Sequence, residues 1–264
     1  MAEPKKSLGQ HWLKDEATLQ AICDAADLEK SDTVLEIGPG LGDLTRQLVK
    51  QAGRVVAVEF DEELASSLRG QVSAENLEVV HEDILKFDLT TLPISYKVVA
   101  NIPYYLTSNL LRVLSESSNP PALLVLLIQK EVAERVAAGL GQMSLLSVSV
   151  QLYYEPLLGP VVAAELFQPP PKIDSQLVIL KQRAEPLFGG LDTKKFFRIV
   201  KAGFSGRRKK LRGSLSAGLG ISKDEADRLL KTTGISGDLR AQNLSLGDWH
   251  KLYKAYQSIN MESR

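Results

Sequence analysis

Four adjacent residues, Asn101-Ile102-Pro103-Tyr104, carry groups that suit chemistry on an aromatic amine. Because the lone pair of such an amine is delocalised into its ring, a catalyst must draw both N–H hydrogens onto acceptors, and the Asn101 side-chain carbonyl and the Ile102 backbone carbonyl can do so. Pro103 fixes the backbone so that the two acceptors converge, and Tyr104 offers a face on which a base can stack. We therefore predict that these four residues are catalytic and act on the exocyclic amine of adenine. A turn with a packed tyrosine is the alternative.

A glycine-rich turn earlier in the chain has the features of a nucleotide site. Gly38, Gly40 and Gly42 follow a short apolar run and open a helical pattern, and Glu59 ends the next run about 20 residues later. Glycines let the backbone pass close to a ligand, and a carboxylate can accept both hydroxyls of a ribose. Glu36, two residues before the first glycine, would repel a pyrophosphate but attract the cationic sulfonium and amine of S-adenosylmethionine. These five residues predict an S-adenosylmethionine site, with a nicotinamide dinucleotide as the alternative.

An acidic pair, Glu82-Asp83, ends the third apolar run. The Asp83 carboxylate can accept the amino group of the cofactor's adenine, and Ile84 can pack on the adenine ring. We therefore predict cofactor contacts at Asp83 and Ile84. A solvated acidic pair is the alternative.

A basic block lies far from these motifs. Between Lys194 and Arg212 the chain has nine Lys or Arg residues and no acidic residue, although its formal net charge is zero. Such a block can follow phosphates, which gives salt-dependent affinity without sequence readout. We predict that its densest part lies in a helix and binds RNA through Arg207, Arg208, Lys209, Lys210 and Arg212. A solvated helix face is the alternative.

Alternating short β-branched runs and amphipathic patterns must position these residues, which is typical of a parallel sheet covered by helices. The predicted strands are residues 33–37, 54–59, 77–81, 97–100 and 123–128, and the predicted helices are 41–50, 62–69, 108–114 and 130–138. The fold class is therefore α/β, with a Rossmann-like, mostly parallel sheet of the class I methyltransferase kind.

The second part of the chain has a different pattern. Two further predicted strands, 157–163 and 176–181, are separated by prolines and complete a seven-stranded sheet as a hairpin. A linker at 185–190 precedes four helical patterns that end near residue 259. We therefore predict a cofactor-binding catalytic domain at 1–184 and a small helical RNA-binding domain at 185–264.

The composition, 264 residues with 44% hydrophobic and 24% charged, is that of a globular protein. The single cysteine, Cys23, excludes an intramolecular disulfide, and we expect it to lie inert in the core. His11 has no second histidine or cysteine at ligand spacing, so no metal site is predicted. The N-terminus lacks an apolar run after its positive charges, and no run is long enough to span a bilayer. We expect a cytoplasmic monomer with no membrane partner.

Together the motifs resemble those of the ribosomal RNA adenine dimethyltransferases that modify two adjacent adenosines near the 3′ end of small-subunit RNA. The resemblance covers nearly the whole chain and is carried by Leu8-Gly9-Gln10-His11-Trp12-Leu13, Glu36 to Gly42, Asn101 to Tyr104, Gln129-Lys130-Glu131 and Phe167 to Ser175. It implies S-adenosylmethionine-dependent dimethylation of the adenine amine, with small-subunit ribosomal RNA or the assembling small subunit as partner and a role in ribosome biogenesis.

The resemblance also implies roles for individual residues, some of which the chemistry above assigns as well. The segment with His11 and Leu13 closes over the cofactor, and Phe167 stacks on the target base opposite Tyr104. Cofactor contacts are implied for Gly38, Glu59, Asp83 and Asn101. This chain departs from the pattern where His11-Trp12 replaces the common Asn-Phe and where Glu82 replaces a smaller or neutral residue.

Two further functions stay open at this point. A large-subunit adenine methyltransferase of the macrolide-resistance type shares Asn-Ile-Pro-Tyr, but the basic helical C-terminal region favours small-subunit RNA. A ribosome-assembly or transcription factor without turnover is compatible with the same fold, but intact Asn101, Tyr104 and Glu59 favour an enzyme.

Overall fold

The computed structural model describes residues 3–5, 8–206 and 208–262, which form two compact units. The first, here called the sheet unit, falls within Met1–Glu134 and Tyr154–Arg183. The second, here called the helical unit, falls within Arg135–Tyr153 and Ala184–Arg264.

The segment Arg135–Tyr153 departs from the predicted domain division. The chain divides after Arg183, next to the predicted boundary, but this earlier segment clusters with the helical unit. The cause is hydrophobic, because Met143, Val148 and Leu152 pack in the core of that unit.

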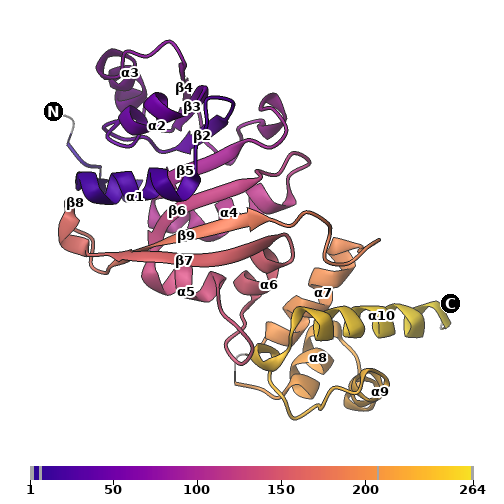
Figure 1. The fold of residues 1–264 in the computed structure, drawn as a ribbon. Helices are drawn as coiled ribbons and strands as arrows, with labels where there is room; N and C mark the ends of the chain where they lie inside the picture. The colour runs from indigo at the N-terminus through magenta and orange to yellow at the C-terminus, as the bar shows by residue number, and fades with distance from the viewer. Residues whose placement is uncertain (1–2, 6–7, 207, 263–264) are drawn as a thin grey trace. The chain divides into compact units, whose positions relative to one another are not determined.

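The sheet unit is built on seven strands in the order β4-β3-β2-β5-β6-β9-β7 (Figure 1). The first five strands of this order pair in parallel, and β9 pairs antiparallel with both β6 and β7. The strands are β2 (Thr33–Ile37), β3 (Arg54–Glu59), β4 (Leu77–His81), β5 (Lys97–Asn101), β6 (Leu123–Gln129), β7 (Tyr154–Val162) and β9 (Ser175–Gln182). The predicted mostly parallel sheet with a closing hairpin is thus confirmed.

The central strands are short runs of apolar residues because both faces of the sheet are covered. In β6, the run Leu124–Ile128 is fully buried, and alternate residues point to opposite faces. Val125 and Leu127 pack with α1 (Glu16–Ala26) and α2 (Thr45–Gln51) on one face.

The other helices of the sheet unit follow from the chain between the strands. The helix α3 (Glu62–Gln71) packs on β3 and β4, and α4 (Thr107–Glu116) lies on the opposite face of the sheet from α1 (Figure 1). The remaining short elements are η2 (Leu89–Thr91), η3 (Tyr104–Leu106), η4 (Ala164–Leu166) and α5 (Lys130–Val136), the last of which continues past Glu134 into the helical unit.

Helix α1 illustrates how spacing sets burial. Its buried residues Leu19, Ile22, Cys23 and Ala26 recur at intervals of three and four, and Asp15 caps its first turn by accepting from the Thr18 amide at 2.8 Å. Burial raises the pKa of the Cys23 thiol to about 12. The expected inert core cysteine is confirmed.

A second, two-stranded sheet pairs β1 (Trp12–Leu13) antiparallel with β8 (Phe167–Gln168). It was not predicted, because two residues carry no periodicity. The pairing ties the N-terminal segment to the connection between β7 and β9.

The helical unit packs its helices around the buried Trp249. Its elements are α6 (Leu145–Gln151), α7 (Thr193–Phe204), α8 (Leu211–Leu219), α9 (Lys223–Thr233), η5 (Ala241–Asn243) and α10 (Leu246–Glu262). The four predicted helical patterns correspond to α7, α8, α9 and α10.

One helical prediction was wrong. Residues Arg208–Lys210, expected to lie in a helix, precede it. Arg208 and Lys209 lie in a turn, Lys210 is the N-cap residue of α8, and α8 begins only at Leu211. The Leu211 amide donates to the Leu239 carbonyl at 2.7 Å, so it does not continue the hydrogen bonds of α7. Within the described residues, no helix is long and apolar enough to cross a membrane.

Candidate functional site

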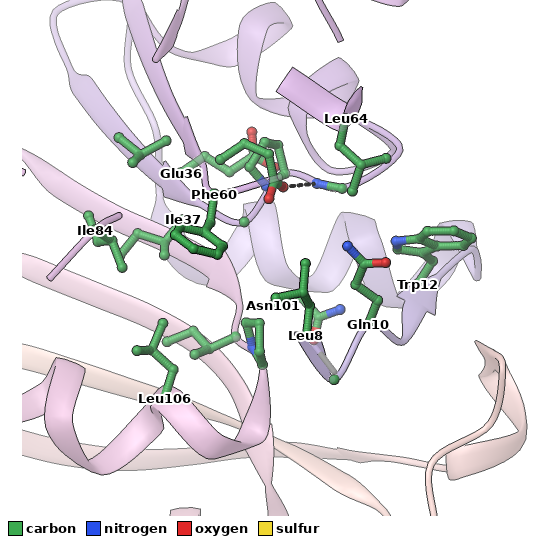
Figure 2. A pocket seen from close by; sticks show the side chains of 18 of the residues that line it. Leu8, Gln10, Trp12, Glu36, Ile37, Phe60, Leu64, Ile84, Asn101 and Leu106 are labelled. Atoms are coloured by element: carbon green, nitrogen blue, oxygen red, sulfur yellow. Dashed lines mark hydrogen bonds between the residues drawn. The ribbon is translucent and has the colours of Figure 1, made fainter. Parts of the chain in front are cut away.

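A cavity of about 300 Å³ lies where the carboxyl ends of β2, β3, β4 and β5 meet. Open α/β sheets bind their ligands at this edge. Figure 2 shows side chains from the strand ends, among them Ile37, Phe60 and Asn101, and from the N-terminal segment, among them Leu8 and Gln10, around the same space.

The glycine turn after β2 forms one wall of the cavity. Gly38, Gly40 and Gly42 all have positive φ, at 66°, 58° and 79°. A Cβ on Gly40 would stand 3.0 Å from the Trp12 indole, so the turn needs glycine both for its conformation and for its contact with the N-terminal segment. Gly38 and Gly40 line the cavity, whereas Gly42 packs against Leu68 of α3 and does not line it.

Glu59 ends β3 as predicted and is held by backbone donors. Its side chain is buried and accepts from the Gly40 amide at 3.2 Å and the Asp61 amide at 2.9 Å. Burial raises the pKa of its carboxyl, and these amides partly oppose that effect. The carboxylate therefore stands rigidly at the cavity wall with lone pairs left for a further donor.

Glu36 is the most unusual group of the site. It is 1% exposed, and neither carboxylate oxygen has a hydrogen-bond partner of good geometry among the described residues. Burial raises its pKa to about 8, and the neighbouring Thr45 hydroxyl offsets this only in part. A buried acceptor without a partner is costly, so the residue fits a ligand that brings a cationic donor into the cavity.

Asp83 and Ile84 follow β4 and line the cavity as predicted. Asp83 accepts from the Leu85 amide at 3.0 Å through one oxygen, which orients its carboxylate. Ile84 is buried and supplies an apolar surface beside it (Figure 2). The pair can receive a planar ring that carries an amino group.

The segment Asn101–Tyr104 leaves the sheet at the end of β5. The Asn101 side-chain NH₂ donates to the His11 carbonyl at 3.1 Å, which leaves its own carbonyl oxygen as the acceptor. The Tyr104 hydroxyl pairs with the Ser175 hydroxyl at 2.8 Å, and the Tyr104 ring stacks at 5.8 Å on the imidazole of His11. Amide and ring are therefore both fixed before any substrate enters.

The chain matches a known protein family along nearly its whole length. The family model described as "Ribosomal RNA adenine dimethylase" matches residues 1–258. The chain belongs to the ribosomal RNA adenine dimethylase family.

Curated members of this family are similar over nearly their whole length. The chain is 43% identical to "Ribosomal RNA small subunit methyltransferase A" of Dehalococcoides mccartyi, with 96% of this chain and 88% of the relative covered. It is 39% identical to the protein of the same name from Streptococcus equi subsp. zooepidemicus, with 97% and 93% covered.

Two solved structures share the architecture of this adenine dimethylase family member. A dimethyladenosine transferase from Plasmodium falciparum superposes with a TM-score of 0.81 at 27% identity, covering 94% of this chain and 98% of that one. The 23S rRNA methyltransferase ErmE superposes with a TM-score of 0.75 at 30% identity, covering 93% and 99%.

In this dimethylase, the N-terminal segment is held over the cavity by residues that the sequence did not single out. Asp61, at the start of α3, accepts from Lys5 Nζ at 3.0 Å and from Gln10 Nε2 at 3.3 Å. Glu63 also pairs with Lys5 at 2.9 Å. A signal was available, because Asp61 follows Glu59 by two residues and caps a helix, but its long-range partners could not be read from local sequence.

His11 and Leu13 take different positions in this segment. Both line the cavity, and the His11 imidazole Nδ1 lies 2.7 Å from the Pro169 carbonyl. Leu13 is buried opposite Phe167 in the β1–β8 pair. Among the described residues, no three His, Cys, Asp or Glu side chains form a cluster suited to a metal.

Phe167 differs from the other candidate residues of this family member. Its side chain is 3% exposed, packs in the core that includes α1, and does not line the cavity. Stacking on a base would require the ring to leave this position, so its predicted role stays a prediction.

The candidate RNA-binding residues fall into distinct environments. Arg207 lies outside the described residues. Arg208 and Lys209 are exposed in the turn before α8. Lys210 pairs with Asp238 at 2.8 Å, and Arg212 pairs with Asp227 at 3.3 Å.

Proposed function

We propose that this protein dimethylates the exocyclic amines of two adjacent adenosines near the 3′ end of small-subunit ribosomal RNA, with S-adenosylmethionine as methyl donor. The observation that carries the proposal is the fixed Asn101 amide at the cavity edge. Its NH₂ group donates to the His11 carbonyl, so its own carbonyl oxygen is the atom left to accept a hydrogen bond from the substrate amine. Family membership and the small-subunit names of the relatives support the same substrate.

The donor site is proposed to consist of the residues at the strand ends. Glu59 would accept the ribose hydroxyls, and Asp83 with Ile84 would receive the adenine. Glu36 would accept the cationic amine of the donor's methionine part, which gives its unpartnered oxygens a use. Gly38, Gly40, His11, Leu13 and Asn101 would enclose the remainder.

Gly42 has an indirect part in this proposal. Its conformation keeps the turn closed against α3, where a Cβ would come within 2.5 Å of Leu68. It therefore shapes the donor site without touching the donor.

S-adenosylmethionine supplies a methyl group made electrophilic by its sulfonium. The Asn101 and Ile102 carbonyls would accept the two hydrogens of the adenine amine, which returns the nitrogen lone pair for attack. Pro103 would hold these two acceptors in place, and Tyr104 would stack on the base. The donor, when bound, would supply the methyl carbon to this nitrogen, and the Asn101 and Ile102 carbonyls would hold the amine until its proton is released to solvent. The monomethylated amine keeps one hydrogen and can pass through the same step again.

RNA affinity is proposed to come from exposed cations of the helical unit, including Arg208, Lys209, Lys210 and Arg212, together with Arg207. Phosphate contacts position the RNA without reading its sequence. The large-subunit alternative is less favoured, because the curated relatives of 38–43% identity carry the small-subunit name. A role in ribosome biogenesis follows if the substrate is an assembling subunit.

The test is transfer of a labelled methyl group to undermethylated small ribosomal subunits, followed by mapping of the modified bases. We expect two methyl groups on each of two adjacent adenines. Undermethylated large subunits serve as the control substrate. Labelling of the large subunit alone would replace the proposal with the alternative, and binding without transfer would support an assembly factor.

A further inference from the structure

We propose that the outer face of α7 binds the phosphate backbone of the RNA substrate. Three cations define this face, here called the α7 basic stripe: Lys194, Arg198 and Lys201. The inference rests on the proposed function, because it assigns a contact surface for the same RNA.

The stripe follows from the helix period. Its residues are spaced by four and by three, so they lie on one side of α7 along about 10 Å of the helix axis. All three are exposed, and no acidic residue occurs between Thr193 and Phe204. The opposite side, with Phe196 and Ile199, is buried. The helix therefore separates its charge fully from its apolar side.

The orientation of α7 is fixed by close packing. A Cβ on Gly203 would come 2.3 Å from the Trp249 ring, and a Cβ on Gly218 would come 2.5 Å from Ala202. Asp192 caps the helix by accepting from the Lys195 amide at 3.1 Å. Because the helix cannot rotate within this core, the stripe is a permanent feature of the surface.

The charges of the stripe are not offset nearby. Among the described residues, none of the three cations forms an ion pair, whereas Lys195 pairs with Asp192 at 3.2 Å. Of the elements packed against α7, α6, α8 and η5 contain no acidic residue. The fourth, α10, carries Glu262 near its end and Asp248, which pairs with Lys251 at 3.4 Å. The Arg198 guanidinium lies 6.0 Å from the ring centroid of Tyr256 on α10, a contact that leaves its charge intact.

Two cations that the sequence favoured are less free than the stripe. Lys210 and Arg212 each have a carboxylate within 3.3 Å, from Asp238 and Asp227. RNA would have to displace these carboxylates or bear their repulsion. The α7 basic stripe is therefore the stronger phosphate site, because phosphates can neutralise it and release counterions without breaking an ion pair.

The experiment compares variants for binding to a transcript of the 3′ domain of unmodified small-subunit RNA across a salt series. The test variant is Lys194→Gln/Arg198→Gln/Lys201→Gln. The matched control, Lys223→Gln/Arg228→Gln/Lys231→Gln, removes the same charges from exposed positions of α9, which also carries Asp224, Glu225 and Asp227. Circular dichroism and thermal unfolding verify that both variants fold.

Loss of three phosphate contacts should lower the log–log salt slope by about 2–3. Between about 50 and 200 mM salt, the parent protein should then lose roughly 15- to 60-fold more affinity than the test variant. The α9 control should keep the parent slope. A test variant with the parent slope would overturn the inference.

Two further measurements separate this inference from the proposed function. If the parent protein neither binds nor methylates the transcript or undermethylated subunits, the proposed function fails. If the parent methylates subunits and the test variant loses affinity for protein-containing subunits while binding the bare transcript normally, the α7 basic stripe contacts a ribosomal protein, and the RNA inference is overturned.

Discussion

At the scale of single residues, the donor cavity contains a buried carboxylate, Glu36, whose burial is energetically unfavourable until a ligand binds it. Glu36 is buried with only the Thr45 hydroxyl nearby and no hydrogen bond of good geometry among the described residues, whereas Glu59 in the same cavity accepts from two backbone amides. In a ligand-free protein, a buried polar group that lacks good hydrogen bonds often marks a binding site, because the ligand can form the missing bonds. The two carboxylates therefore differ in role, although both were predicted from the sequence to bind the methyl donor.

Replacing Glu36 by Gln should stabilise the donor-free protein at high pH. The pKa of Glu36 is raised from 4.5 to about 8, so the folded state holds a proton that the unfolded state releases between these values. Stability of the parent therefore falls as pH rises through this window, and the Gln variant lacks that loss. We expect equal stability near pH 4 and a gain of more than about 1 kcal/mol for Glu36→Gln by pH 8.

Denaturant unfolding at several pH values measures this difference. Donor affinity of the same variant should fall roughly 10- to 100-fold, because a charge-assisted hydrogen bond is lost. Parallel pH profiles of the two proteins would contradict the assignment of Glu36.

Replacing Asn101 by Ala should slow methyl transfer about 100-fold or more while RNA binding is retained. The reason is that its carbonyl interaction strengthens as the amine nitrogen begins to form its new bond. Single-turnover rates measure the step directly. Asn101→Asp keeps an acceptor but loses the donor to His11, so its rate should lie between those of the parent and the Ala variant. Near-normal transfer by Asn101→Ala would make the residue structural.

At the scale of elements, continuous apolar runs could be predicted well and short or long-range pairings could not. The strands Thr33–Ile37, Arg54–Glu59 and Leu77–His81 agree with their predicted bounds, because buried parallel strands are read directly from β-branched runs. Helix α2 begins at Thr45 instead of residue 41, since the positive φ of Gly42 is incompatible with a helix.

The missed features share a physical cause. Two features were missed: the β1–β8 pair, and the hydrogen bonds of Lys5 and Gln10 to Asp61, here called the Asp61 clasp. Each joins residues distant in sequence through a few contacts. The buried position of Phe167 likewise depends on the pairing of its strand with Leu13. The site could thus be predicted from its residues at the strand ends. Its cover at His11 and Leu13 was implied only by the family resemblance, and the contacts that hold this cover were not predicted.

Replacing Asp61 by Asn should loosen the N-terminal segment and speed donor release about tenfold. Asn serves as well as Asp at a helix N-cap, so α3 should persist while the ionic contact with Lys5 and the geometry at Gln10 are weakened. Stopped-flow donor dissociation and limited proteolysis near residue 10 report the change. Glu63→Gln, which removes only an exposed contact with Lys5, is the control and should behave nearly as the parent. Equal rates of donor release for the parent and Asp61→Asn would mean that the Asp61 clasp does not retain the methyl donor.

At the scale of the whole molecule, the two units carry separate chemistry on separate cores. The candidate residues of the methyl-donor site all belong to the sheet unit. Arg208 and Lys209, in the turn before α8, and the helix α7 belong to the helical unit. A chain with no net charge can still bind RNA in this way, because residues 194–212 of the helical unit hold nine Lys or Arg and no acidic residue.

This separation predicts that donor binding and RNA binding can be weakened independently. Glu59→Ala should reduce donor affinity roughly 10- to 100-fold through loss of the ribose hydrogen bonds and leave the RNA salt slope unchanged. Arg208→Gln/Lys209→Gln should lower the salt slope by about 1.5, the value for two phosphate contacts, and leave donor affinity unchanged.

Calorimetry with the donor and RNA titrations across a salt series, on both variants and on their combination, measure all four effects. Additive losses in the combined variant are expected, because the two sites belong to separate units and share no hydrogen-bond or ion-pair partner among the described residues. A donor affinity that falls with Arg208→Gln/Lys209→Gln would show instead that the two sites are coupled.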